Sequence, residues 1–173
     1  MRKLLLVIDM QNDFVDGALG TKEAAGIIDK AASVIDTYPE EDIIATRDTH
    51  TEDYLSTEEG KHLPVKHCIR GSYGWEINKK IQNAVRNAAI IDKPSFGSPE
   101  LAEKIKHAAE KDKIEVTLIG LCTDICVISN AILLKAYVPE IEVNVIASCC
   151  AGVTPESHEA ALLTMRMCQI NII

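Results

Sequence analysis

The sequence is poor in basic residues and in aromatic residues. Its 18 lysines and arginines are outnumbered by 26 acidic residues, the net charge is −8, and aromatic residues make up 4% of the chain. Because this charge repels phosphates, and because no basic run or RNA-binding aromatic motif is present, nucleic acid is excluded as a partner. The longest apolar runs have only the length of a strand, so we expect no segment that crosses a membrane.

Two further absences narrow the class of protein. The first apolar run is followed by MQNDFVDGALG and not by a G-x-G-x-x-G turn, so we expect no nucleotide cofactor and no dinucleotide-dependent dehydrogenase. The opening stretch MRKLLLVIDMQNDF lacks a small-residue cleavage site, and Asp9 interrupts its apolar run. We therefore interpret it as the first strand and not as a signal peptide.

The six cysteines have no zinc-ribbon spacing, and two of them, Cys149 and Cys150, are adjacent. In a chain of this size without a signal peptide, free thiols in a reducing compartment are expected in place of disulfides. The sequence therefore predicts a cytoplasmic protein.

Short apolar runs alternate with amphipathic segments along the whole chain, without an internal repeat or a linker. Apolar runs that do not alternate with polar residues are typical of strands buried on both faces, as in a parallel sheet covered by helices. We predict a single α/β domain over residues 1–173, a Rossmann-like three-layer α/β/α sandwich with a mostly parallel six-stranded sheet and right-handed crossovers. The expected strands are 3–9, 42–48, 88–94, 114–121, 142–148 and 167–173, and the expected helices are 23–37, 74–86, 99–111, 123–136 and 155–167.

Three reactive residue types are expected at one edge of this sheet, where ligands of such folds bind. Asp9 ends the first strand, Lys93 ends the third, and Cys126 lies in the opening turn of the helix after the fourth. The first turn of a helix carries free amides and the positive end of the dipole, which favour a thiolate and can receive an oxyanion. The amide of Cys122 lies at the same joint. Plainer roles remain open: a core cysteine, a surface lysine and a turn-capping acid.

A second cluster follows the second strand. Asp48 and His50 are two residues apart at a strand end, so their side chains can point the same way. His67 follows after a loop that also contains Glu58, Glu59 and His62. One carboxylate and two imidazoles suit Zn²⁺, Mn²⁺ or Fe²⁺. His62 competes with His67 as the second imidazole, and an acidic solvated loop with incidental histidines is the competing interpretation.

Five motifs, in this order along nearly the whole chain, resemble those of the isochorismatase-like cysteine hydrolases, and the nicotinamidase-related amidase branch fits best. They are LLLVIDMQNDF, TRDTH, HCIRGSYGWEI, DKPSFGS and LIGLCTDICV. The resemblance implies the isochorismatase-like hydrolase fold and a catalytic triad of Asp9, Lys93 and Cys126. It also implies a cis peptide bond between Leu121 and Cys122, which turns the Cys122 amide towards the oxyanion beside the amide of Cys126.

The same resemblance implies a divalent metal, with zinc favoured over manganese or iron, on Asp48, His50 and His67. An acidic residue or waters would complete the shell, and position favours Glu59 over Glu58. Phe14 would stack on a planar substrate ring. Two departures from the family pattern weaken the assignment of nicotinamide. Pro64 stands where many nicotinamidases have tryptophan, and Thr51 stands where proline is frequent.

The expected activity is hydrolysis of a small amide, with nicotinamide to nicotinate and ammonia through a thioester as the leading candidate. Ureido-acid or carbamoyl amidases are the nearest rival, and Arg70 would then bind a substrate carboxylate. More distant candidates are an isochorismatase-type vinyl ether hydrolase and a non-catalytic metal-binding module. By analogy with relatives, a homo-oligomer is expected, for which ILLKAY and SCCAGVTPESHEAALLTM offer an interface.

Overall fold

The computed structural model describes all residues 1–173 and contains one six-stranded sheet in the order β3-β2-β1-β4-β5-β6. All five strand pairs are parallel, so the sheet is parallel throughout and not only mostly parallel, as the sequence indicated. The strands are β1 (Arg2–Ile8), β2 (Ile43–Asp48), β3 (Ala89–Lys93), β4 (Ile114–Leu121), β5 (Glu142–Ala151) and β6 (Asn171–Ile172).

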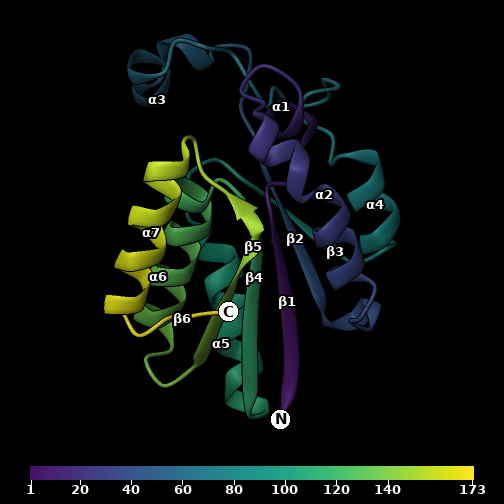
Figure 1. Ribbon diagram of the computed structural model, residues 1–173, viewed down its shortest axis with the longest axis vertical. Helices are drawn as coiled ribbons and strands as arrows, with labels where there is room; N and C mark the ends of the chain where they lie inside the picture. Colours follow the sequence, from purple (N-terminus) through teal and green to yellow (C-terminus); the bar gives the residue numbers. More distant parts are fainter.

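Helices cover both faces of the sheet, which confirms the predicted three layers (Figure 1). In β1, Leu5 and Val7 face one side and pack in a core with α2 and α4, whereas Leu4 and Leu6 face α5, α6 and α7. This alternation explains why β1 has no polar residue between Leu4 and Ile8. The helices are α1 (Asn12–Val15), α2 (Lys22–Ile35), α3 (Glu58–His62), α4 (Lys79–Val85), α5 (Pro99–Lys111), α6 (Ile128–Tyr137) and α7 (Pro155–Met167), with short turns η1 (Glu40–Asp42), η2 (Tyr54–Ser56) and η3 (Thr123–Val127).

Two helices begin where the sequence predicts, because both have strong start signals. The side chains of Ser98 and Thr154 cap α5 and α7, and a proline occupies the first turn of each helix. The helix expected over residues 74–86 is shorter, since α4 begins only at Lys79 after its cap Asn78. The residues before Asn78 instead hydrogen-bond to the start of α1, and this contact shapes the loop above the sheet.

The carboxyl ends of β1 and β4 are held unusually close together by Gly120. This residue pairs with Ile8 and has a φ of 128°, in the region that favours glycine. A Cβ atom at this position would lie 2.0 Å from the carbonyl oxygen of Ile8. The close approach is therefore specific for glycine, and it sets Asp9, which follows β1, beside the segment that follows β4.

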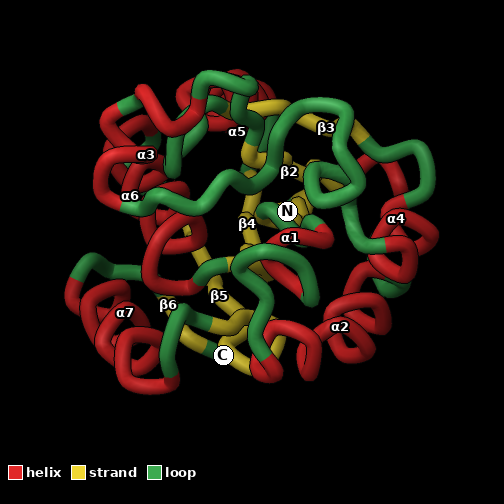
Figure 2. The backbone as a smooth tube through the Cα atoms, turned by 90° about the horizontal axis from the view of Figure 1, so that it is seen from above, coloured by secondary structure: helices red, strands yellow, loops and turns green.

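The loops after the strands gather over one edge of the sheet, as Figure 2 shows from above. α1 lies over this edge, and α3 stands farther out on the loop after β2 (Figure 1). None of the helices combines the length and the apolar content that crossing a bilayer requires.

Candidate active site

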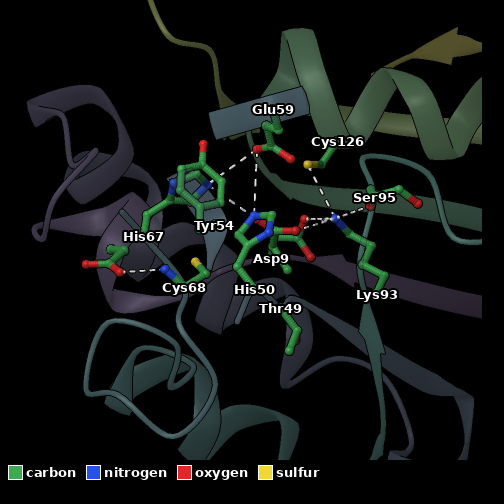
Figure 3. Close-up of polar contacts among 12 residues, drawn as sticks. Asp9, Thr49, His50, Tyr54, Glu59, His67, Cys68, Lys93, Ser95 and Cys126 are labelled. Atoms are coloured by element: carbon green, nitrogen blue, oxygen red, sulfur yellow. Dashed lines mark hydrogen bonds and ion pairs between the residues drawn. The ribbon is translucent and has the colours of Figure 1, made fainter. Parts of the chain in front are cut away.

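Asp9, Lys93 and Cys126 meet at the carboxyl edge of the sheet, each carried by a different segment (Figure 3). The Lys93 Nζ lies 2.6 Å from Asp9 Oδ2 and 3.5 Å from Cys126 Sγ. It also donates to the carbonyl of Ser95 at 3.0 Å. All three side chains are buried, with exposed fractions of 4% or less. The ammonium therefore bridges a carboxylate and a thiol in a site nearly free of solvent.

Burial and mutual charge set the protonation of this trio. Burial raises the pKa of Asp9, although the Lys93 ammonium opposes the shift. Burial would lower the pKa of Lys93, but the Asp9 carboxylate outweighs it and the pKa is raised. Burial and then the charge of Asp9 raise the pKa of the Cys126 thiol well above its usual value. The resting site is an ion pair beside a neutral thiol.

This result corrects the expectation of a thiolate at rest. The backbone amides around Cys126 favour a thiolate, but the carboxylate beside its sulfur opposes it. Because Asp9 and burial both disfavour a second anion, the thiol keeps its proton at rest.

Cys126 lies in η3, a π-helical turn that precedes α6, and not in the first turn of α6 itself. The carbonyl of Cys122 accepts the N–H groups of Ile125 and Val127 at 3.2 and 3.0 Å and so closes this turn. The peptide bond between Leu121 and Cys122 is cis, as the resemblance implied. No protein acceptor is present for the Cys122 N–H, so this donor is available to a ligand.

A second cluster lies next to the trio. Asp48, His50, Glu59 and His67 each offer one ligand atom, and the four atoms lie within 4.8 Å of one another. The shortest contact joins His50 Nε2 to Asp48 Oδ2 at 2.9 Å. His67 Nε2 lies 3.5 Å from Asp48 Oδ2 and 3.6 Å from Glu59 Oε1. Asp48 Oδ1 is also 3.8 Å from Lys93 Nζ, so the two clusters adjoin.

The donor set fits a divalent metal ion. Burial would raise the pKa of Asp48, but hydrogen bonds with His50 and His67 outweigh it and lower the pKa. Burial and the charge of Asp48 raise the pKa of Glu59. Burial would lower the pKa of His67, but Asp48 and the Val65 carbonyl raise it. Two carboxylates and two imidazoles therefore lie close together and share protons through hydrogen bonds. A divalent cation can take the place of these protons, because it binds the same oxygen and nitrogen atoms.

Neighbouring groups orient three of the four donors, namely His67, His50 and Asp48. His67 Nδ1 donates to the Val65 carbonyl at 2.8 Å, which turns Nε2 towards the cluster. Tyr54 is fully buried, and its ring lies edge-on to His50 and His67, at centroid distances of 4.7 and 5.0 Å. Gln11 clamps the backbone of Asp48 through both its amide N–H₂ and its carbonyl.

Three residues that the sequence left as candidates lie outside these clusters. Glu58 is exposed and pairs with Lys61 at 3.1 Å. His62 is 78% exposed, and its Nδ1 contacts the Glu58 carbonyl, so His67 and not His62 is the second imidazole of the cluster. Arg70 pairs with Asp92 at 2.9 Å, near Trp75, and does not line the cavity described next.

Both clusters open into one cavity of about 580 Å³. Cys122 and Cys126 line it on one side, and Asp48, Glu59 and His67 line it on another. Most of the remaining wall is apolar. It includes both phenylalanines of the chain, Phe14 and Phe96, together with Leu19, Leu63, Ile125 and Val153. Phe14, for which the resemblance implied stacking on a substrate ring, thus lines the cavity, whereas Pro64 does not.

Asn130 of α6 connects η3, which carries Cys126, to the cavity wall. Its Nδ2 donates to the carbonyls of Cys126 and Phe96 at 2.8 and 3.1 Å. Its Oδ1 accepts the N–H of Ser98 at 2.9 Å. One buried amide therefore fixes the loop after Lys93 against the turn that carries Cys126.

The family model of the isochorismatase domain matches residues 3–173 of this chain. The chain belongs to the isochorismatase family. Its relatives in this family include the nicotinamidase of Escherichia coli K12, which is 26% identical over 95% of this chain and 90% of that protein.

Solved structures of the isochorismatase family have the same fold. The pyrazinamidase of Pyrococcus horikoshii, solved in complex with zinc, superposes with a TM-score of 0.80 at 28% identity and covers 100% of this chain and 99% of its own. The nicotinamidase PncA of Bacillus subtilis gives a TM-score of 0.82 at 26% identity, with 99% of both chains covered.

Four residues that contact the two clusters were not predicted from the sequence, namely Thr46, Gln11, Tyr54 and Asn130. Two of them carry a weak signal. Thr46 is a polar residue within the apolar run of β2, and Asn130 is a polar residue within the apolar helix α6. A polar residue inside a buried element needs a partner, but the sequence does not say which.

Proposed function

We propose that this protein is a cysteine-dependent amide hydrolase that converts nicotinamide to nicotinate and ammonia through a thioester. The observation that carries the proposal is the Lys93 ammonium, 2.6 Å from Asp9 and 3.5 Å from Cys126, at one side of an apolar cavity. Membership of the isochorismatase family and the nicotinamidases among its relatives support the same chemistry.

In the first half-reaction, Asp9 accepts the thiol proton of Cys126 as the sulfur attacks the amide carbonyl carbon. Lys93 stays protonated and stabilises the negative charge that moves through the site. The tetrahedral oxyanion is received by the amides of Cys122 and Cys126. The loss of one such donor costs about 2.7–4 kcal/mol of transition-state stabilisation in hydrolases, so these amides supply a large share of the rate.

Collapse of the intermediate breaks the C–N bond. Asp9, now protonated, gives its proton to the departing nitrogen, which leaves as ammonia, and an acyl thioester remains on Cys126. A water molecule then gives a proton to Asp9 and attacks the thioester carbonyl. The C–S bond breaks, the carboxylic acid is released, and the proton returns to the sulfur.

Asp48, His50, Glu59 and His67 would hold a divalent metal ion, and their nitrogen and oxygen donors favour Zn²⁺ over Mn²⁺ or Fe²⁺. The zinc complex of the Pyrococcus horikoshii pyrazinamidase supports this choice. A bound cation supplies a Lewis-acid contact for a pyridine or pyrazine nitrogen and thereby orients the ring.

The cavity favours a neutral, flat amide over a ureido or carbamoyl acid. A substrate carboxylate needs a cationic partner, but Arg70 is paired with Asp92 outside the cavity. Lys93 is already shared among Asp9, Ser95 and Cys126. The apolar wall with Phe14 and Phe96 instead suits a heteroaromatic ring.

Six free cysteines support a cytoplasmic location.

The test is ammonia release from nicotinamide, pyrazinamide and a set of carbamoyl amino acids, with and without added zinc after chelation. We expect turnover of the two ring carboxamides. Turnover confined to carbamoyl acids, with carbon dioxide released together with ammonia, would replace nicotinamide by a carbamoyl substrate. Hydrolysis of a vinyl ether that survives Cys126→Ala would indicate isochorismatase-type chemistry, and metal binding without any turnover would indicate a binding module.

A further inference from the structure

The two carboxylate oxygens of Asp9 have different partners. Oδ1 accepts a hydrogen bond from the hydroxyl of Thr46 at 2.6 Å. Oδ2 lies 2.6 Å from Lys93 Nζ and, apart from this ion pair, has no hydrogen-bond partner in the protein. Because Asp9 is completely buried, no water from bulk solvent evens out this difference.

The direction of the Thr46 hydroxyl is fixed by a second hydrogen bond. The backbone N–H of Asp9 donates to Thr46 Oγ1 at 3.2 Å. Since the hydroxyl accepts from this N–H, its single proton points to Oδ1. Thr46 is fully buried in β2, next to β1, and therefore holds both the backbone and the side chain of the same aspartate. That backbone has a φ of 45°, an uncommon conformation for a residue other than glycine.

We propose that Thr46 is a positioning residue, which fixes the Asp9 carboxylate so that Oδ2 is the oxygen that accepts the thiol proton of Cys126. A carboxylate turns about its Cβ–Cγ bond unless something holds it. The Thr46 bond occupies Oδ1 and leaves Oδ2 on the side of Lys93, whose Nζ is 3.5 Å from the sulfur. A general base works only within hydrogen-bond reach of its proton, so this orientation matters for the rate. The inference rests on the proposed amide hydrolysis.

The charged and titratable groups that face Asp9 come from three segments: Lys93 of β3, Asp48 of β2 and the thiol of Cys126 in η3. Burial and Asp48 raise the pKa of Asp9, whereas Lys93 and the Thr46 hydroxyl lower it because both favour the ionised carboxylate. Without the hydroxyl, Asp9 would be both less well oriented and more easily protonated.

The kinetic test uses three variants. Thr46→Val removes the hydroxyl at nearly constant volume, Thr46→Ser keeps it, and Thr117→Val makes the same change at a buried position of β4 whose side chain makes no hydrogen bond. For Thr46→Val we expect kcat to fall about 10- to 100-fold with KM changed less than about twofold, and the acid limb of kcat/KM to move to higher pH. Thr46→Ser restores both the rate and the pH profile, and Thr117→Val changes neither.

A second readout needs no substrate. In protein labelled with ¹³C at the aspartate carboxyl, the Asp9 resonance is assigned by its absence in Asp9→Asn and is titrated with pH. We expect a higher Asp9 pKa in Thr46→Val than in the wild type and in Thr46→Ser. This result would stand even if nicotinamide were not hydrolysed, so failure of the proposed function and failure of this inference are distinguishable. An unchanged titration, a loss confined to KM, or an equal loss in Thr46→Ser would each overturn the role of Thr46.

Discussion

Cys126 is a buried thiol next to the Asp9–Lys93 ion pair, and in the proposed mechanism its proton moves to Asp9. The raised pKa of the sulfur means that a thiol, and not a thiolate, meets the substrate beside the Asp9–Lys93 ion pair. The proton then moves a short distance within the trio. This arrangement explains why all three side chains are buried so completely.

Replacement of Cys126 tests the proposed covalent mechanism directly. Cys126→Ala removes the sulfur that forms the thioester, and we expect ammonia release to fall at least about a thousandfold, as for the loss of other nucleophiles. Its matched control is Cys168→Ala, because Cys168 is an exposed thiol outside the site. Circular dichroism checks that both variants fold. If Cys126→Ala kept turnover comparable to that of the control, the covalent mechanism would be wrong.

The pH dependence of the reaction follows from Asp9. Only the ionised carboxylate accepts the thiol proton, so activity is present above the Asp9 pKa and is lost as the pH falls through it. Because burial raises this pKa, the acid limb of kcat/KM is expected at a higher pH than an ordinary aspartate would give. Steady-state rates measured across the acidic range at saturating zinc test the expectation. An acid limb at or below the usual aspartate value would contradict it.

At the scale of elements, the site is assembled by strand ends, by η3 and by the loops after β2 and β3. Asn130 holds η3 and the loop after β3 together through three hydrogen bonds. For Asn130→Ala we expect a loss of at least about 2 kcal/mol in the free energy of unfolding, because buried partners lose their hydrogen bonds. Activity should fall as well, since the loop after Lys93 and the turn of Cys126 are no longer fixed to each other.

The matched control is Asn144→Ala. Asn144 is also buried, but its amide bonds to Glu115 and Asn171, at the far end of the sheet. We expect this variant to lose stability in denaturant unfolding while it keeps its kcat. Equal losses of kcat in both variants would show that Asn130 acts only through global stability.

Most elements could be predicted from the sequence because their signals are local. The proline and cap at the start of α5 and α7 indicated both helices, and the apolar runs indicated the first five strands. Of the strand expected over 167–173, only Asn171–Ile172 is a strand, because Met167 ends α7 and Cys168 caps it. The late start of α4 goes with tertiary contacts to α1, which are distant in the chain. The π-helical turn at Cys126 is closed by local hydrogen bonds to the Cys122 carbonyl, for which the sequence carries no signal. The same holds for the site. Strand ends predicted where Asp9 and Lys93 would lie, but the partners of Thr46 are distant in the chain.

At the scale of the whole molecule, the candidate metal site joins segments that are otherwise separate. Asp48 ends β2 and His50 follows it, Glu59 comes from α3, and His67 comes from the loop beyond α3. A cation that binds only this folded arrangement stabilises it, by an amount that grows with ligand concentration over its dissociation constant.

We therefore expect zinc to raise Tm and chelation to lower it. His67→Ala should abolish stoichiometric metal and the shift in Tm, and should raise KM for ring amides. His62→Ala is the matched control, since His62 is exposed and outside the cluster, and it should keep both. Metal content by elemental analysis and Tm by scanning calorimetry are the measurements. A wild type that holds no metal when zinc is abundant would refute the assignment.

The polar reactive side chains and the apolar side chains around the cavity are carried by different parts of the fold. The reacting groups stand on the ends of the sheet, and the Gly120 contact ties those ends together. Three residues of the apolar wall, Leu63, Phe96 and Val153, instead lie in loops and belong to neither core. Substrate preference can therefore diverge through these peripheral positions while the chemistry stays intact, which makes the wall the natural target for redesigning this hydrolase towards other amides.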